Sequence, residues 1–150
     1  MSNRLTFKDA TIMWRNFRGQ GTDFNPAGSR NFAVLITDAD EAERLKEEGW
    51  NLKQLKPRDE DDSPAWALKV KVKFGVRPPK VYLVTYPNGE IKKTMLDEDT
   101  IGMLDWAEIQ KVDLVVSAYD WTMHGKDGRT AYLDVMYFTP IEDELSGDYE

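Results

Sequence analysis

Residues 66–74 (WALKVKVKF) constrain the fold more than any other stretch, because apolar and basic side chains alternate along most of them. Successive side chains of a β-strand point to opposite faces, so this pattern predicts a strand with one buried face and one exposed face. The predicted buried face holds Trp66, Leu68, Val70, Val72 and Phe74. The predicted exposed face holds Lys69, Lys71 and Lys73. Neighbouring lysines on that face would lie ~7 Å apart.

Several other short runs are rich in β-branched and aromatic residues and are bounded by turn residues, which predicts further strands. These runs cover residues 11–17, 31–37, 50–56, 80–86, 91–96, 112–121 and 129–139. Gly, Asn, Pro and Ser make residues 18–30 a long loop, and residues 124–128 predict a hairpin turn. Two segments that begin with acids, residues 38–49 and 97–109, predict short helices.

This order of elements predicts a mostly β fold, because it lacks the strand–helix–strand rhythm of a parallel sheet. We expect an OB-like antiparallel Greek-key barrel with extra strands and one or two short helices. A plain β-sandwich is the main alternative, since periodicity does not separate the two architectures. The chain has 150 residues, enough for one ordinary core. We therefore expect one OB-like domain over residues 1–140 and an acidic tail over residues 141–150.

The net charge of −7 hides a segregation of charge along the chain. Residues 66–93 hold seven bases against one acid, a local charge of +6, whereas residues 141–150 hold five acids and no base. An acidic end with few apolar residues is typical of a disordered interaction tail, and a merely solubilising end is the alternative. The tail residues expected to bind a partner are Glu142, Asp143, Glu144, Leu145, Asp148, Tyr149 and Glu150.

The residues that most enzymes need are missing from this sequence. It contains no Cys, and His124 is its single His, which leaves no basis for a disulfide, a thiolate metal site or a His-based triad. Gly19-Gln20-Gly21 is followed by no Gly-Lys-Ser/Thr, so it is not a phosphate-binding P-loop. We therefore expect no catalytic residue, no metal and no cofactor. No apolar run reaches the ~18–20 residues of a membrane span, so we expect no membrane partner and a cytoplasmic location.

The lysine face has the composition of a surface for single-stranded nucleic acid. A positive groove with aromatic platforms binds single strands without sequence preference, because every base has a face that stacks. In residues 80–86, Lys80, Tyr82 and Tyr86 share one face, which would lie beside the lysines if the two strands pair. The alternative is a lysine face that only keeps an exposed strand soluble.

The strand at residues 11–17 and the loop after it offer further cations and aromatics. Alternation places Arg15 and Phe17 on one face, opposite Ile12 and Trp14. Tyr119 and Trp121 share a face of the last hairpin, and we expect them to be ordinary core and turn residues. The residues expected to bind nucleic acid are Arg15, Phe17, Arg18, Phe24, Arg30, Lys69, Lys71, Lys73, Arg77, Lys80, Tyr82 and Tyr86.

Five short motifs, taken in order, resemble those of phage-encoded single-stranded DNA-binding proteins of the OB-fold type. They are Asn25-Pro26-Ala27-Gly28-Ser29-Arg30-Asn31-Phe32, Gly49-Trp50-Asn51-Leu52-Lys53, Leu55-Lys56-Pro57-Arg58-Asp59, Arg77-Pro78-Pro79-Lys80-Val81 and Leu104-Asp105-Trp106. The similarity spans most of residues 7–139. It implies an OB-like barrel that coats single-stranded DNA in phage replication or recombination, in the cytoplasm of the host. It also implies an acidic tail that recruits replication or recombination proteins.

A protein-interaction module is the rival hypothesis from another functional class. Such a module would be an acidic mimic of DNA that inhibits a DNA-binding protein of the host. A mimic needs ordered acids on the barrel, whereas this chain concentrates five acids in residues 141–150.

Overall fold

The computed structural model describes residues 3–22, 25–56, 63–75 and 77–141. Strands dominate this part of the chain, with one α-helix and two 3₁₀ helices between them. The elements are β1 Arg4–Phe7, β2 Ile12–Asn16, β3 Arg30–Ile36, α1 Ala39–Glu47, β4 Leu52–Gln54, β5 Trp66–Val72, β6 Lys80–Thr85, η1 Pro87–Gly89, β7 Lys92–Leu96, η2 Ile101–Asp105, β8 Ile109–Met123 and β9 Lys126–Pro140. Among the described residues, no helix is long and apolar enough to cross a membrane.

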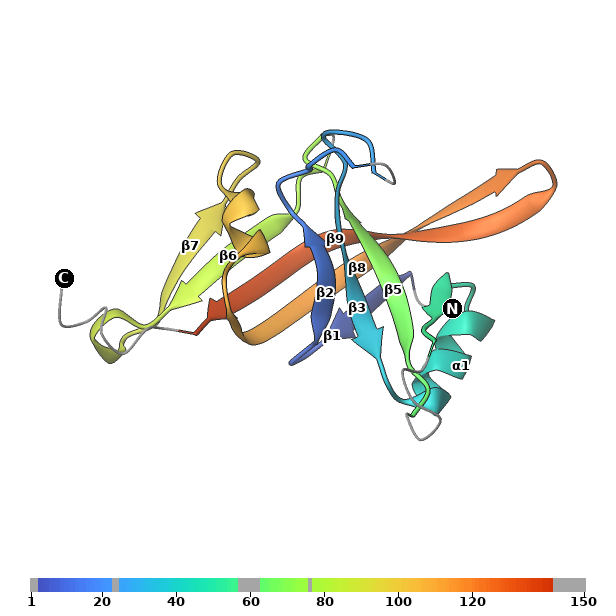
Figure 1. Cartoon of the computed structure of the whole chain (residues 1–150), viewed down its shortest axis with the longest axis horizontal. Coiled ribbons are helices and arrows are strands. Elements are labelled where there is room, and N and C mark those ends of the chain that lie inside the picture. Colours follow the sequence, from blue (N-terminus) through green and yellow to red (C-terminus); the bar gives the residue numbers. More distant parts are fainter. Residues whose placement is uncertain (1–2, 23–24, 57–62, 76, 142–150) are drawn as a thin grey trace.

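Six strands form the barrel, in the order β1-β8-β9-β5-β3-β2. The sheet closes because β1 and β2, which follow one another in the chain, lie at the two ends of that order (Figure 1). If β1 and β2 are counted as one broken strand, this is the five-stranded Greek-key arrangement of an OB fold. The predicted mostly β, OB-like fold is confirmed. The sheet is mixed rather than wholly antiparallel, because β5 and β6 both pair with β9 in parallel.

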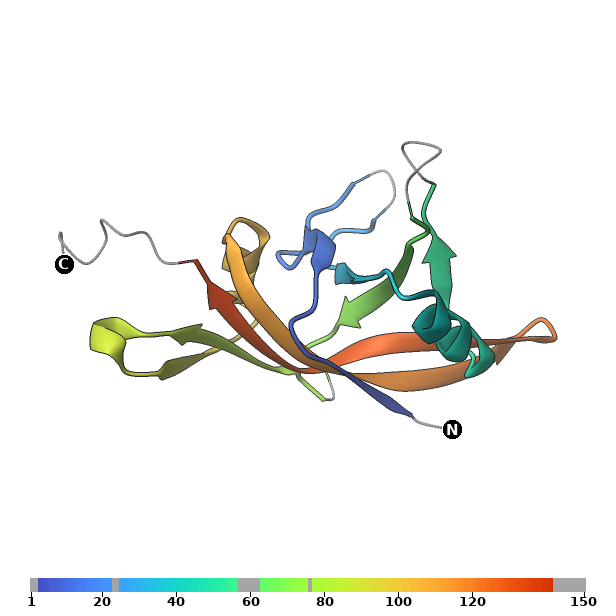
Figure 2. The same ribbon diagram turned by 90° about the horizontal axis from the view of Figure 1, so that it is seen from below.

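Two hairpins extend from the barrel in opposite directions (Figures 1 and 2). One is the long pair β8 and β9, which turns at His124 and Gly125 with φ of 52° and 76°. Positive φ at both turn residues is what a two-residue hairpin loop requires. The other hairpin is β6 and β7, and it joins the barrel where β6 pairs with β9.

The first predicted helix is confirmed as α1. The Asp38 carboxylate accepts hydrogen bonds from the amides of Asp40 and Glu41, so it caps the first turn. Gly49, with φ of 95°, follows the helix end. Ala42 and Leu45 lie buried on the face that covers the barrel.

The second predicted helix, over residues 97–109, is wrong. Only the short 3₁₀ helix η2 forms there, and strand β8 begins at Ile109. The carbonyl oxygens of Leu104 and Ala107 accept hydrogen bonds from the Arg15 guanidinium instead of from helical amides. Arg15 is 89 and 92 positions away from these two residues, so local periodicity does not predict the contacts.

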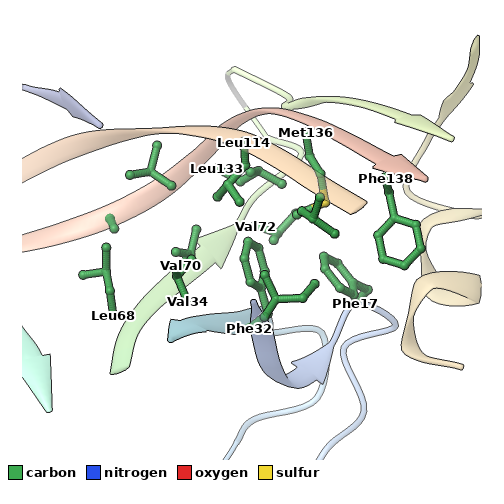
Figure 3. Packing of buried hydrophobic residues seen from close by; sticks show 14 of the residues in the cluster. Phe17, Phe32, Val34, Leu68, Val70, Val72, Leu114, Leu133, Met136 and Phe138 are labelled. Carbon is green, nitrogen blue, oxygen red and sulfur yellow. The ribbon is translucent and has the colours of Figure 1, made fainter. Parts of the chain in front are cut away.

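The core lies inside the barrel and brings together the inward faces of its strands. In Figure 3, Phe17, Phe32, Val72 and Met136 point toward one another from different strands and loops. Phe17 and Phe32 stack with their ring centroids 5.1 Å apart, and both are buried. The apolar face predicted for residues 66–72 is buried as expected, while Phe74 is only partly buried.

Candidate nucleic-acid interface

The outward face of β5 carries the predicted lysines. Leu68, Val70 and Val72 are buried, so the alternating Lys69 and Lys71 point away from the core. Lys69 and Lys73 are exposed, and Lys71 is half-buried. On β3, Ala33 pairs with Lys69 and Asn31 pairs with Lys71. Both of these neighbours have small side chains. This face therefore leaves room for a ligand above the sheet.

A groove of about 510 Å³ opens on this face. Trp14 from β2, Lys53 from β4 and Lys69 from β5 line it. The Lys53 ammonium lies 5.8 Å from the centroid of the Trp14 ring. The rest of the lining is Asn25, Asn31, Phe32, Ala33, Asn51 and Ala67. The groove thus combines one exposed indole, two cations and several amides.

A bulge in β2 turns Trp14 into this groove. Trp14 and Arg15 together face the single residue Phe32, because Met13 pairs with Ala33 and Asn16 pairs with Asn31. Trp14 has φ of 52°, and its side chain is 56% exposed. The extra residue reverses the alternation along the rest of the strand.

The prediction that Phe17 stacks on nucleic-acid bases is therefore wrong. The bulge places Phe17 in the core, where its exposed fraction is 0%. Trp14, which regular alternation assigns to the core side, is the exposed aromatic of this strand.

Trp14 also lines a second hollow, of about 360 Å³. Arg18 and Trp106 line it, and the Arg18 guanidinium carbon is 4.5 Å from the Trp106 ring centroid. Trp106 is 65% exposed. Because Trp14 lines both hollows, they form adjoining parts of one surface.

Arg15 and Asp105 fix the position of this second hollow. The Arg15 guanidinium donates to the carbonyl oxygens of Leu104 and Ala107 at 2.8 and 2.7 Å. The Asp105 carboxylate accepts from the amides of Phe17 and Arg18 at 2.6 and 3.1 Å. Arg15 is among the residues expected to bind nucleic acid, and its guanidinium instead holds the backbone on both sides of Trp106, at Leu104 and Ala107.

Arg30 is also committed to the protein itself. Its guanidinium pairs with Glu98 at 3.3 Å and lies 5.7 Å from the Phe74 ring centroid. The side chain is 17% exposed. It holds the loop before β3 against the segment after β7, so its predicted role as a phosphate ligand is not supported.

The lysine face continues onto β9 through Tyr132. Lys71 and Tyr132 are neighbours in the parallel register of β5 and β9, and the Lys73 ammonium lies 5.5 Å from the Tyr132 ring centroid. Tyr119 packs edge-on against Tyr132 with the ring centroids 6.1 Å apart. Tyr119 is 59% exposed, so the expectation that it is a core residue is wrong.

We call the combined surface the groove face. It consists of Trp14, Arg18, Lys53, Lys69, Lys71, Lys73, Trp106, Tyr119 and Tyr132. None of the described residues forms an ion pair with Lys53, Lys69, Lys71 or Lys73. By contrast, the described arginines at positions 4, 18, 30 and 129 each pair with a carboxylate. The four lysines of the groove face are therefore not neutralised by a described carboxylate, and they lie on the same surface as the exposed rings of Trp14 and Trp106.

The remaining predicted residues lie elsewhere. Strands β5 and β6 do not pair, so Lys80, Tyr82 and Tyr86 are on the β6–β7 hairpin instead of beside the lysines. Arg77 is exposed in the segment that connects the two strands. Phe24 and the predicted partner-binding residues 142–150 lie outside the described residues.

Comparisons with known proteins place this geometry in a family. A family model described as a putative phage ssDNA-binding domain matches residues 1–150. The chain belongs to this family. Among curated proteins, none matches the sequence.

The fold is similar to that of the single-stranded DNA-binding protein from bacteriophage Enc34. One structure of that protein matches with a TM-score of 0.57 and 9% identity, over 99% of this chain and 90% of that chain. A structure of it in complex with ssDNA matches with a TM-score of 0.59 and 8% identity, over 94% of this chain and 88% of that chain. At such low identity, the likeness concerns the fold.

Sequence reasoning missed five members of the groove face in this phage ssDNA-binding domain. They are Trp14, Lys53, Trp106, Tyr119 and Tyr132. Lys53 and Trp106 fall within two of the motifs that carry the family resemblance, which was an available signal. Trp14 was hidden by the bulge, and Tyr132 by a parallel pairing between residues 61 positions apart.

Among the described residues, no group of three or more acids or His gathers in a way that would hold a metal ion. Two carboxyl groups have shifted pKa values. A hydrogen bond from the Arg129 guanidinium lowers the pKa of Asp120, and a hydrogen bond from the Thr100 hydroxyl lowers the pKa of Asp97. Neither residue belongs to the groove face.

Proposed function

We propose that this protein binds single-stranded DNA along the groove face, without sequence preference and without catalysis. The observation that carries the proposal is the set of unpaired lysines between exposed aromatic rings on the outer face of β3 and β5. In OB folds, this face and the loops beside it bind oligonucleotides.

The chemistry of the groove face fits a single strand better than a duplex. Bases would stack on Trp14 and Trp106, whose rings are 56% and 65% exposed. Phosphates would contact Lys53 and Lys69, which both line the 510 Å³ groove. A duplex hides the faces of its bases, so stacking on these rings requires an unpaired strand.

The biological setting proposed is the replication or recombination of phage DNA in the cytoplasm of the host. The family description and the Enc34 protein, itself described as a single-stranded DNA-binding protein, support this setting. We further propose that the acids of residues 142–150 recruit a replication or recombination protein, since they concentrate negative charge next to a basic domain.

A labelled oligothymidylate tests the proposal by fluorescence anisotropy at two salt concentrations. We expect binding that weakens as salt rises, because each neutralised phosphate releases counterions. We also expect weaker binding to a duplex of the same length. Equal affinity for both forms would refute a stacking site. Binding to a basic host protein, with no binding to DNA, would instead favour the acidic-mimic hypothesis.

A further inference from the structure

The β6–β7 hairpin carries a second surface with the same chemistry as the groove face. Among the described strands, β7 pairs only with β6, and β6 meets the barrel only along β9. The hairpin therefore extends away from the barrel as an arm (Figure 1). Its position shows that it is not needed to close the barrel.

Two stacked tyrosines form the centre of the outer side of this arm. Tyr82 of β6 is the register neighbour of Tyr137 of β9, and their rings stack with centroids 5.2 Å apart. Met136 and Phe138 on either side of Tyr137 are buried, so Tyr137 points away from the core. Tyr137 remains 37% exposed. Such an exposed stack offers a planar surface to a further ring.

Two lysines flank this stack. The Lys93 ammonium lies 5.4 Å from the Tyr137 ring centroid, and Lys80 shares the face of Tyr82 by alternation. Both lysines are exposed, and no described residue forms an ion pair with either of them. We call Lys80, Tyr82, Lys93 and Tyr137 the arm face.

Strand β9 connects the arm face to the groove face. Tyr132, which belongs to the groove face, and Tyr137 both point away from the core, because Leu133 and Met136 are buried and a register shift at Asp134 interrupts the alternation between them. They are five positions apart in the sequence, which corresponds to about 17 Å along a strand. A few extended nucleotides cross such a distance.

We propose that the arm face is a second binding site for the same DNA strand, which continues from the groove face along β9. The inference rests on the proposed function of the groove face. It adds the prediction that long oligonucleotides contact both faces, whereas short ones occupy the groove face alone.

The test compares two lengths of labelled oligothymidylate, about 6 and about 20 nucleotides, because one OB fold covers roughly 4–16 nucleotides. The full-length variants are Lys93→Glu, Tyr82→Leu and the control Lys8→Glu. The control makes the same change of charge at an exposed lysine outside both faces. Thermal melting verifies that each variant is folded, and sedimentation gives its oligomeric state.

We expect Lys93→Glu and Tyr82→Leu to weaken binding of the long oligonucleotide about tenfold, in line with the loss of one stacked base or one phosphate contact. Binding of the short one should change less than about twofold, and Lys8→Glu should leave both nearly unchanged. Unchanged affinity for the long oligonucleotide in folded Lys93→Glu would overturn the proposal.

Three other results would also overturn the proposal of a second binding site. Equal weakening at both lengths would mean that the two faces form one site. Altered self-association with unchanged DNA affinity would make the arm face an interface between copies of the chain. Failure of the unaltered protein to bind either length would overturn the proposed function itself.

Discussion

Trp14 offers a sharp test of the groove face, because its side chain and its backbone conformation make separate predictions. The ring is 56% exposed and lines both hollows. Its φ of 52° lies in the left-handed region, which a side chain with a Cβ atom disfavours. We therefore compare two substitutions, Trp14→Ala and Trp14→Gly.

Both substitutions remove the ring and should weaken DNA binding equally. Stacking on an aromatic ring is worth about 1–3 kcal/mol per base, which corresponds to a loss of about 5- to 150-fold in affinity. Anisotropy of a labelled oligothymidylate measures this loss. A labelled DNA is the suitable probe, since removing one of the five tryptophans would alter the intrinsic fluorescence.

The two variants should differ in stability, and Trp14→Gly should have the higher free energy of unfolding. Left-handed backbone costs a residue with a Cβ atom about 1–2 kcal/mol, and glycine loses about 0.5–1 kcal/mol more conformational entropy on folding. The difference leaves Trp14→Gly more stable than Trp14→Ala by about 0.5–1 kcal/mol. Urea unfolding followed by circular dichroism measures it.

DNA affinity and stability can each contradict the proposed role of Trp14. If both folded variants bind DNA within about twofold of the original protein, Trp14 is not a stacking platform. If Trp14→Ala is as stable as Trp14→Gly, the bulge does not hold residue 14 under strain.

Three further predictions concern the core, the long hairpin and the acidic end. Phe17→Ala should lower the free energy of unfolding by about 3–5 kcal/mol, because the ring is buried against Phe32, while the folded fraction still binds DNA; normal stability with lost binding would return Phe17 to the interface. Asp120→Asn should lower stability at neutral pH, where the carboxylate accepts from Arg129 at 2.7 Å. The pKa of Asp120 is lowered from 3.8, so the stabilisation by the Asp120–Arg129 pair is present above pH 3.8 and disappears as the pH falls through the lowered pKa. The melting temperatures of the original protein and of Asp120→Asn should therefore converge in acid. A difference in melting temperature that persists in acid would mean that the Asp120–Arg129 pair is not its cause. Deleting residues 141–150 should tighten DNA binding at low salt, because five acids no longer compete for the lysines; unchanged affinity at low salt would remove this competition.

Local patterns were sufficient wherever a single strand or turn decides the structure. The alternation in residues 66–72 predicted which apolar side chains are buried and which face carries the lysines, because the period of a strand is a property of its own backbone. Asp38 and Gly49 likewise marked the ends of α1, because the residues that begin and end a helix act on the backbone next to them.

Expectations failed where a contact distant in sequence decides the outcome. The β2 bulge exchanges the positions of Trp14 and Phe17, and it forms against β3. Where a helix is predicted over residues 97–109, the carbonyl oxygens of Leu104 and Ala107 accept hydrogen bonds from Arg15, 89 and 92 positions away. The local sequence of neither segment indicates its partner, which is β3 for the bulge and Arg15 for residues 104 and 107.

The sequence alone thus determined a basic, aromatic-rich β domain with an acidic end and the family that it resembles. Tertiary structure decided which cations and rings share a surface. Strands β5 and β6 both lie along β9, so the predicted lysines and tyrosines occupy two faces instead of one. Charge and periodicity belong to the chain, whereas strand pairing depends on how the whole barrel closes, and that closure selects the residues that meet.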